Sequence, residues 1–290
     1  MFQVLSKKDL NQESVMMEIE APLIAKKAKP GQFIIFRVHE NSERIPLTIA
    51  GVDPERGAVK IIFQKVGKGT IELGQKQPGD SIQDFVGPLG HPSPLDGYQG
   101  KRVAVLGGGL GVAIAYPQAI YLHKTGALVD LMVGFRNTDV IILKDDLEAA
   151  SDRFYLITDD GSSGKKGFVT NLLAERLEAG DHYDLVIAIG PMGMMKAVCD
   201  LTAKYNVPTM VSMNTIMVDG TGMCGSCRVT VGGKVKFACV DGPDFDGHQI
   251  DFDEAMKRSR AYRPKELSNK DHYCKLLAEA DHAQGQSASK

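Results

Sequence analysis

The sequence predicts an antiparallel β-barrel, then a parallel α/β domain, then a small cysteine-bearing segment. Three observations support this order. Short β-branched runs bounded by Pro, Gly and Asp fill residues 1–97, strand and helix patterns alternate over 98–215, and three cysteines cluster within 216–250. Residues 251–290 are expected to form C-terminal helices and a tail. At 290 residues, the chain is long enough for two or three domains.

Two short motifs distinguish the N-terminal region, "RIPLT" and "GKGT". Arg44, beside the rigid Pro46, is suited to holding a phosphate through two parallel hydrogen bonds, although a strand arginine is more often a solvated surface residue. Gly69 and Thr70 offer an amide and a hydroxyl where a short helix is expected to begin.

The middle region alternates strands such as "KRVAVLGGG" and "YDLVIAIG" with helices such as "YPQAIYLHKTG" and "PMGMMKAVCDLTAKYN". This alternation predicts a parallel sheet with helices on both faces. Pro117 is expected at the first position of its helix, because proline is favoured there. The loop before that helix is therefore expected to be long.

Glycine-rich loops follow two of these strands. Gly108, Gly109 and Gly111 let a backbone approach a pyrophosphate, but Val112 stands where a dinucleotide fingerprint has its third glycine. The loop alone is equally consistent with a plain strand-to-helix turn. A second loop starts at Gly190, and two such loops at the carboxyl edge of one sheet favour a nucleotide.

The cysteine segment reads "DGTGMCGSCRVTVGGKVKFAC", with a hairpin expected at its Gly-Gly. The spacing of Cys224, Cys227 and Cys239 is typical of a metal or iron–sulfur site, and structural zinc is an alternative. Cys199 and Cys274 are both expected to be buried helix residues rather than ligands.

Composition and charge argue against several classes of protein. The net charge of −2 gives no reason to expect nucleic acid as a partner, and no apolar run is long enough to span a membrane. The N-terminus lacks the apolar core of a signal peptide, and an odd number of clustered cysteines does not resemble a disulfide framework. A cytoplasmic protein is expected.

Taken in this order, the motifs resemble the ferredoxin–NADP reductase superfamily over residues 1–250. The matching stretches are "RIPLT", "GKGT", "GGGLGVA", "TDDGSSGKKGFVT", "GPMGMMKAV" and the cysteine segment. The cysteines narrow the resemblance to electron-transfer subunits found with dihydroorotate dehydrogenase, with sulfide dehydrogenase and in NADH-dependent reduced ferredoxin:NADP oxidoreductase.

The resemblance implies an FAD-binding barrel, an NAD(H)-binding α/β domain and a [2Fe-2S] cluster segment. Thr48 is implied as the catalytic residue, because its hydroxyl would hydrogen-bond near the flavin N5. The flavin-binding set it implies is Arg44, Pro46, Leu47, Thr48, Ile62, Phe63, Gly69 and Thr70. The nucleotide-binding set is Gly108, Gly109, Gly111, Asp160, Gly190, Pro191 and Met192.

The resemblance also implies a fourth cluster ligand. In the dihydroorotate-linked relatives a cysteine precedes the C-x2-C pair by five residues, and here that position is Asp219. A carboxylate can bind ferric iron, much as histidine does in Rieske centres. The implied ligands are Asp219, Cys224, Cys227 and Cys239, and with a flavin upstream an electron relay is favoured over zinc.

A nicotinamide moves electrons in pairs and a cluster singly, whereas a flavin does both. The resemblance implies an oxidoreductase subunit of an electron-bifurcating ferredoxin:NADP transhydrogenase, with a larger flavin/iron–sulfur partner that binds NADP(H) and ferredoxin. NAD(H) is favoured for this chain, because Arg136 is the only basic residue in "GFRNTDVI". The alternatives are a dihydroorotate dehydrogenase electron-transfer subunit and a ferredoxin-like carrier without nucleotide turnover. The basic stretch "MKRSRAYRPKE" is either a docking site for the partner or a solvated helix face.

Overall fold

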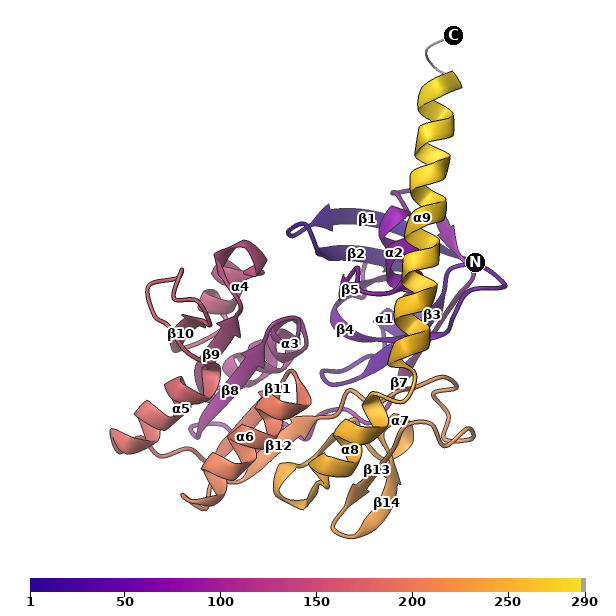
Figure 1. Ribbon diagram of the computed structural model, residues 1–290. Coiled ribbons are helices and arrows are strands. Elements are labelled where there is room, and N and C mark those ends of the chain that lie inside the picture. Colours follow the sequence, from indigo (N-terminus) through magenta and orange to yellow (C-terminus); the bar gives the residue numbers. More distant parts are fainter. Residues whose placement is uncertain (288–290) are drawn as a thin grey trace.

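The computed structural model describes residues 1–287, and the side chains of residues 1–279. A barrel, an α/β domain and a C-terminal segment follow one another along the chain, and the last helix runs past the barrel and projects from the body (Figure 1). The predicted fold class is confirmed. The tail expected at the end of the chain extends into residues 288–290, which lie outside the described part.

The barrel is a seven-stranded antiparallel sheet in the order β6-β1-β2-β5-β4-β3-β7. Side chains of a strand alternate between its two faces, and Val15, Met17 and Ile19 of β2 all point into a fully buried interior. Two helices accompany it, α1 (Pro22–Ala25) and α2 (Lys68–Gln75). The strands are β1 (Phe2–Asp9), β2 (Ser14–Glu20), β3 (Phe33–Arg37), β4 (Ile45–Asp53), β5 (Ala58–Gln64), β6 (Ser81–Ile82) and β7 (Asp84–Leu89).

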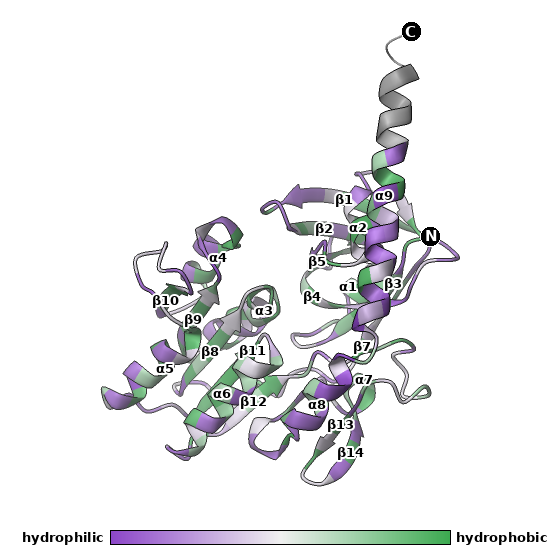
Figure 2. Cartoon of the chain, in the orientation of Figure 1, coloured by the Kyte–Doolittle hydropathy of each residue, from purple (hydrophilic) through white to green (hydrophobic). Residues whose placement is uncertain are grey.

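The α/β domain is a six-stranded sheet in the order β10-β9-β8-β11-β12-β15, and its first five strands are parallel. Alternate residues of the central strand pack on opposite helices: Val103 and Val105 contact the layer of α3 and α4, whereas Leu106 contacts that of α5 and α6. The central strands are correspondingly apolar in Figure 2. The elements are β8 (Arg102–Gly108), α3 (Gly111–Lys124), β9 (Leu128–Phe135), η1 (Thr138–Val140), α4 (Lys144–Ala149), β10 (Arg153–Thr158), α5 (Val169–Glu178), β11 (Leu185–Ile189), α6 (Met192–Ala203) and β12 (Thr209–Ser212).

The expected start of the helix after β8 was wrong. Helix α3 begins at Gly111, directly after the two-residue turn of Gly109 and Leu110, and Pro117 lies inside it. The turn is short because Gly111 packs against β11: a Cβ there would be 2.4 Å from the carbonyl oxygen of Ile189. The amino end of α3 therefore points directly at the carboxyl edge of the sheet.

The cysteine segment folds as a hairpin and a strand. Strands β13 (Arg228–Val231) and β14 (Lys234–Phe237) are joined by Gly232 and Gly233, whose positive φ angles of 57° and 73° give the predicted two-residue turn. After α7 (Ala238–Asp241), β15 (Asp244–Asp246) pairs antiparallel with β12. The sheet of the α/β domain is thus not wholly parallel, and the cysteine segment supplies its last strand. Helices η2 (Gly247–Gln249) and α8 (Phe252–Ser259) follow.

The final helix, α9 (Arg263–Ser287), contacts the barrel through few side chains. Tyr273 donates a hydrogen bond to Gln75 Oε1 of α2 at 3.1 Å, and its ring lies beneath Lys68. Cys274 is exposed, so its expected burial was wrong. Between residues 263 and 279, no side chain of α9 is fully buried, so this part of the helix has no buried face on which Cys274 could lie. Within residues 1–287, no helix has both the length and the apolarity needed to cross a membrane.

Candidate functional site

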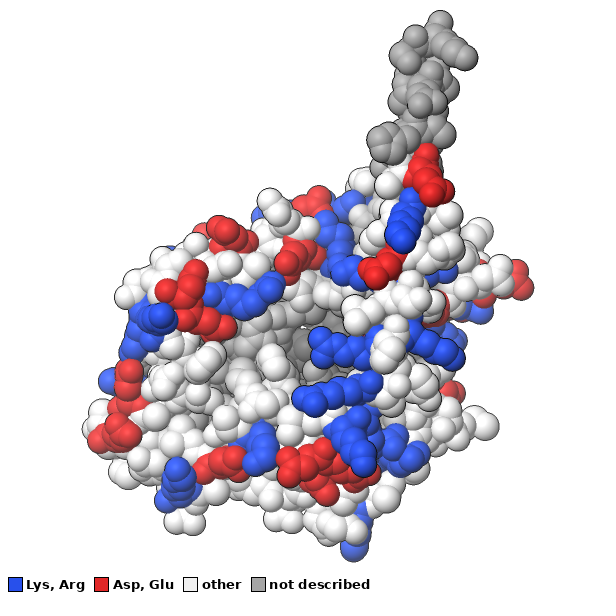
Figure 3. Space-filling view, viewed as in Figure 1, with Lys and Arg blue, Asp and Glu red and all other residues white. Residues whose placement is uncertain are grey.

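A cavity of about 1390 Å³ lies between the barrel and the α/β domain, and Figure 3 shows a hollow in this face of the molecule. Strands β4 and β5 form its barrel side. The loops after β8, β9, β11 and β12 form the opposite side, because the carboxyl ends of parallel strands meet at one edge. Met217 and Pro243 of the cysteine segment also line the cavity, so all three parts of the chain meet there.

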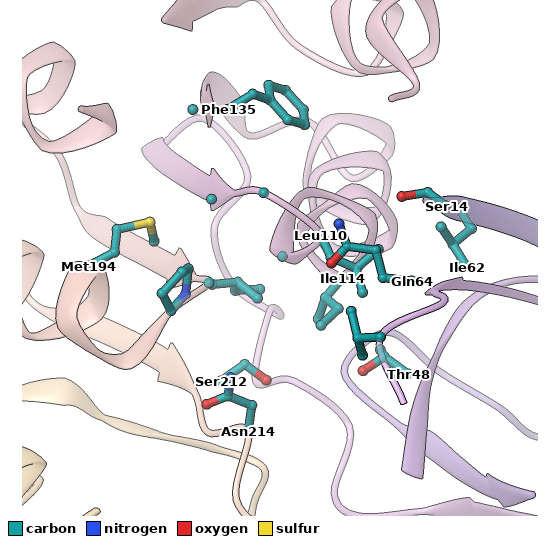
Figure 4. Close-up of a pocket in the computed structure, with 18 of the residues that line it drawn as sticks. Ser14, Thr48, Ile62, Gln64, Leu110, Ile114, Phe135, Met194, Ser212 and Asn214 are labelled. Atoms are coloured by element: carbon teal, nitrogen blue, oxygen red, sulfur yellow. The ribbon is translucent and has the colours of Figure 1, made fainter. Parts of the chain in front are cut away.

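On the barrel side, Pro46, Leu47 and Thr48 of β4 line the cavity, together with Ile62 of β5. Figure 4 shows Thr48, Ile62 and Gln64 on the side opposite Met194, with Leu110 and Ile114 between them. Phe63 points the other way along β5 and is fully buried in the barrel interior. The structure thus brings Ile62 to the cavity but not Phe63.

On the α/β side, the two glycine loops touch one another. A Cβ at Gly108 would lie 2.4 Å from Met194 Sδ and 3.3 Å from Pro191 Cδ. Gly109 has a φ of 56°, a conformation that glycine adopts without strain. The cavity lining from these loops includes Gly108, Gly109, Gly111, Gly190 and Pro191. The amino ends of α3 and α6 therefore open together on one space, an arrangement that suits phosphate.

Gly69 and Thr70 lie behind the cavity wall, in the first turn of α2. The Thr70 hydroxyl accepts hydrogen bonds from the amides of Val66 and Gly67, both at 3.1 Å, and so caps the helix. A Cβ at Gly69 would come within 2.4 Å of Ile45 Cδ1. Their direct effect is to shape the turn at Lys65 and Val66, which does line the cavity.

Two predicted nucleotide-binding residues also lie off the cavity surface. Met192 is buried in the core at the start of α6. Asp160 is exposed and accepts hydrogen bonds from the Ser162 amide and hydroxyl, and the hydroxyl bond holds the pKa of its carboxyl below the usual range. Its neighbour Asp159 lines the cavity instead.

Arg44 reaches from the barrel to the cysteine segment. Its Nε donates to the carbonyl oxygen of Val218 at 2.8 Å, and its Nη2 donates to that of Asp219 at 3.4 Å. The residue is partly buried, and is therefore not the freely solvated arginine that the sequence left open. Arg44 is the first residue of "RIPLT", so its guanidinium joins that motif to the backbone of the first predicted cluster ligand.

Two of the four predicted ligands, Cys227 and Cys239, are buried, whereas Cys224 is exposed and Asp219 is partly buried. The Sγ atoms of Cys227 and Cys239 are 3.2 Å apart and buried, and burial raises the pKa of the Cys239 thiol to about 12. Cys224 is exposed, and a hydrogen bond with the Ser226 side chain lowers the pKa of its thiol. Hydrogen bonds from Thr221, chiefly from its hydroxyl, hold the pKa of the Asp219 carboxyl below the usual range.

The predicted donors are three cysteine thiols and one carboxylate, a set that suits a thiolate-bound centre. Among the side chains of residues 1–279, no three His, Cys, Asp or Glu groups converge closely enough to hold one metal ion. The loop between Asp219 and Cys227 has positive φ angles at Gly220, Gly222 and Gly225, so its amides can turn inward. Cys199 is buried as expected, and burial raises the pKa of its thiol to about 12.

Sequence reasoning missed several polar residues of the cavity. Ser212 is the last residue of β12, and Asn214 and Thr215 follow it; Figure 4 shows Ser212 and Asn214 next to one another. The Thr215 hydroxyl is buried with no hydrogen-bond partner among the described residues, so the cavity offers it to a bound group. Their position after the fifth parallel strand was the available signal. Glu13, Ser14 and Gln64 of the barrel had no comparable signal.

Comparisons with known proteins match two parts of the chain to described families. Residues 105–200 match an oxidoreductase NAD-binding domain, and residues 214–251 match the iron–sulfur cluster binding domain of dihydroorotate dehydrogenase B. The second match spans all three clustered cysteines and Asp219.

Similar proteins cover nearly the whole chain. An uncharacterized protein from the adh 3′ region of Clostridium beijerinckii is 50% identical over 92% of both chains. A dihydroorotate dehydrogenase B (NAD(+)) electron transfer subunit homolog from Thermotoga maritima is 46% identical, over 91% of this chain and 92% of its own. A structure of NADH-dependent reduced ferredoxin–NADP oxidoreductase, solved to study flavin-based electron bifurcation, is 41% identical. It covers 94% of this chain and 97% of its own, with a TM-score of 0.88.

These matches confirm the resemblance to the ferredoxin–NADP reductase superfamily and the three expected cofactors, FAD, a [2Fe-2S] cluster and NAD(H). The protein is an oxidoreductase with NAD-binding and iron–sulfur domains. The chain belongs to the family of dihydroorotate dehydrogenase B electron transfer subunits and their homologues.

Proposed function

We propose that this chain is the NAD(H)-side subunit of an electron-bifurcating ferredoxin:NADP transhydrogenase. The observation that carries the proposal is the meeting of three segments at one cavity: β4 of the barrel, the two glycine loops, and Met217 with Pro243 of the cysteine segment. The proposal divides the chain at the predicted boundaries, with the barrel at 1–97, the nucleotide domain at 98–215, the cluster segment at 216–250 and the helices after 251.

At the nucleotide side, the backbone is proposed to do most of the binding. Gly108, Gly109 and Gly111 bring amides at the amino end of α3 to the pyrophosphate, and Gly190 with Pro191 does the same at α6. Met192 supports that turn from the core, and Asp160 is proposed to act at the rim. No proton has to move through a side chain here, since hydride transfer is direct.

At the barrel side, Pro46, Leu47 and Ile62 are proposed to provide an apolar surface for the flavin ring. The Thr48 hydroxyl is the polar group of that surface and would donate or accept a hydrogen bond near N5. Gly69, Thr70 and Phe63 act indirectly by holding the wall that lines the cavity. The flavin supplies the exchange between paired and single electrons.

Cys224 marks the proposed point at which electrons pass between this chain and its partner. It is exposed, and the apolar side chains of Val218 and Met223 in the same loop and of Val240 in α7 are exposed with it, Met223 by 88%. Exposed apolar groups around a redox centre suit contact with another protein. A larger flavin/iron–sulfur partner that binds NADP(H) and ferredoxin is proposed to dock there, and NAD(H) as the nucleotide of this chain favours a cytoplasmic location.

A dihydroorotate dehydrogenase electron transfer subunit is the second candidate. The match of residues 214–251 to the cluster domain of that enzyme favours it. Asp219 argues for the bifurcating complex, because the dihydroorotate-linked pattern has cysteine at that position. The 41% identity over 97% of the bifurcating oxidoreductase chain supports the same choice.

The decisive experiment is isolation of the chain with its natural partner under anaerobic conditions. We expect FAD and two irons on this chain, and NADPH oxidation that reduces NAD⁺ and ferredoxin together in a fixed ratio. Dihydroorotate-dependent reduction of NAD⁺ without ferredoxin would favour the second candidate. A complex without flavin or iron on this chain would overturn both.

A further inference from the structure

An ion pair joins the barrel to the nucleotide domain at the cavity. Arg136 Nη2 lies 3.0 Å from Glu13 Oε2 and 3.3 Å from Glu13 Oε1. Both residues line the cavity, and their side chains are 67% and 48% exposed. Glu13 comes from the turn between β1 and β2, whereas Arg136 follows the last residue of β9.

The position of Arg136 has a defined chemistry in an open parallel sheet. At the end of the strand next to the pyrophosphate-binding strand, an acid selects the free 2′-hydroxyl of the adenosine ribose, and an arginine selects a 2′-phosphate. Strand β9 is the neighbour of β8 on that side. Taken alone, Arg136 would therefore favour a phosphorylated nucleotide.

Hydrogen bonds hold Glu13 beside Arg136, where its negative charge opposes the preference of Arg136 for a phosphorylated nucleotide. Its backbone carbonyl accepts the amide of Lys65 at 2.8 Å, and its carboxylate accepts Gln64 Nε2 at 3.0 Å. On the other side, the backbone amide of Asp160 donates to the carbonyl oxygen of Arg136 at 3.3 Å, so the backbone at Asp160 lies next to that of Arg136. Lys65 also lines the cavity, from the barrel side.

We propose that Glu13 is a specificity-determining residue that neutralises Arg136 and so makes the site select NAD(H) over NADP(H). A 2′-phosphate would have to displace the Glu13 carboxylate and would then lie close to a like charge, whereas a free hydroxyl fits beside the intact ion pair. The inference rests on the proposed function, because it takes the nucleotide to enter this cavity. Exposed ion pairs contribute little to folding stability, so Glu13 can be changed without unfolding the chain.

The test compares ADP-ribose with 2′-phospho-ADP-ribose, by calorimetry on the FAD-loaded protein. Glu13→Gln should tighten binding of the phosphorylated ligand about tenfold, or ~1.4 kcal/mol, and leave ADP-ribose within about twofold. Arg136→Gln should weaken only the phosphorylated ligand, and the double variant should show no gain. The matched control is Glu18→Gln, which removes a carboxylate of β2 paired with Arg56 away from the cavity lining.

An unchanged ratio in Glu13→Gln would overturn the inference, as would a gain that persists in the double variant. Rates of anaerobic flavin reduction by NADH and NADPH should shift in the same direction. Wild-type protein that binds neither ligand and is reduced by neither nucleotide would overturn the proposed function as well. Normal NADH reduction with no shift in any variant would overturn this inference alone.

Discussion

Arg44 of the barrel donates a hydrogen bond from Nε to the carbonyl oxygen of Val218, 2.8 Å away and 174 residues later in the chain. A second bond reaches Asp219, so one guanidinium holds two successive carbonyls of the cluster loop. The residue that the sequence associates with the flavin therefore also positions the loop that carries the first predicted ligand. A substitution of Arg44 should therefore affect both flavin binding and the conformation of the cluster loop.

We expect Arg44→Ala to lower flavin retention and to speed amide exchange over residues 216–222, because each charge-assisted hydrogen bond lost costs ~1.5–3 kcal/mol. Arg44→Lys keeps the positive charge but cannot donate to two carbonyl oxygens at once. It should therefore restore flavin retention more fully than it restores slow amide exchange in residues 216–222. Flavin content and hydrogen–deuterium exchange measure the two effects. Arg37→Ala is the control, since Arg37 pairs with Asp84 within the barrel. Wild-type behaviour in both measurements would remove Arg44 from the site.

Asp219 is predicted to be the fourth cluster ligand. Asp219→Cys should keep a two-iron cluster with an altered spectrum, whereas Asp219→Ala should leave an open iron site and a labile cluster. The flavin should stay bound in both, because its barrel is a separate part of the chain. Iron and sulfide content with electron paramagnetic resonance checks this. Thr221→Val, which removes the hydroxyl that bonds to the Asp219 carboxylate, is the matched control for loop disturbance. Identical spectra in wild type and both Asp219 variants would show that the carboxylate is not coordinated.

Gly111 is the tightest point of the nucleotide loop. A Cβ there would meet the Ile189 carbonyl oxygen at 2.4 Å and Gly190 Cα at 2.7 Å, and neither backbone atom can move cheaply. Gly111→Ala should therefore lower the free energy of unfolding by ~1–3 kcal/mol and weaken ADP-ribose binding. Gly193→Ala, on helix α6 with no atom within 4 Å of the added Cβ, is the stability control and should gain ~0.5–1 kcal/mol. Equal stability of the two variants would contradict the close approach.

Asp244 joins all three parts of the chain. Ser93 of the segment after the barrel donates to its Oδ2, and Gln118 Nε2 of α3 lies 3.5 Å from the same atom. The residue as a whole is only partly buried, but its Oδ1 has no solvent contact and no partner within the described part of the chain. The carboxyl is thus enclosed, and this burial raises its pKa to about 6.

A raised carboxyl pKa means that the native state binds the proton more tightly than the unfolded chain does. The free energy of unfolding should therefore fall as the pH rises from about 4 through 6, by up to ~3 kcal/mol from this group. Asp244→Asn should remove that fall, and should stabilise the protein at pH 7 more than at pH 4.5. Denaturant unfolding at both pH values measures it, with Asp200→Asn on the exposed face of α6 as the control. A stability difference that is the same at both pH values would show that Asp244 titrates normally.

Local patterns in the sequence determined most of the architecture and part of the site. Period-two alternation and glycine turns predicted the barrel and the β13–β14 hairpin, because both depend on neighbours along the chain. The carboxyl ends of parallel strands meet at one edge of a sheet, which predicted that the two glycine loops converge, and they touch at Gly108 and Pro191. The same local reasoning put the start of α3 at Pro117, since the contact of Gly111 with β11 cannot be read from its neighbours.

Only the tertiary structure decided which side chains face the cavity, which are buried and which contact residues far away in the chain. Phe63 and Ile62 are equally apolar, and only the facing of β5 assigns one to the barrel core and the other to the cavity. Cys274 has a helical setting like that of Cys199, but α9 leaves the body and α6 does not. The contacts of Glu13 with Arg136 and of Arg44 with Val218 join residues more than 100 positions apart. No local pattern encodes such contacts, because they arise from the packing of whole domains around one cavity.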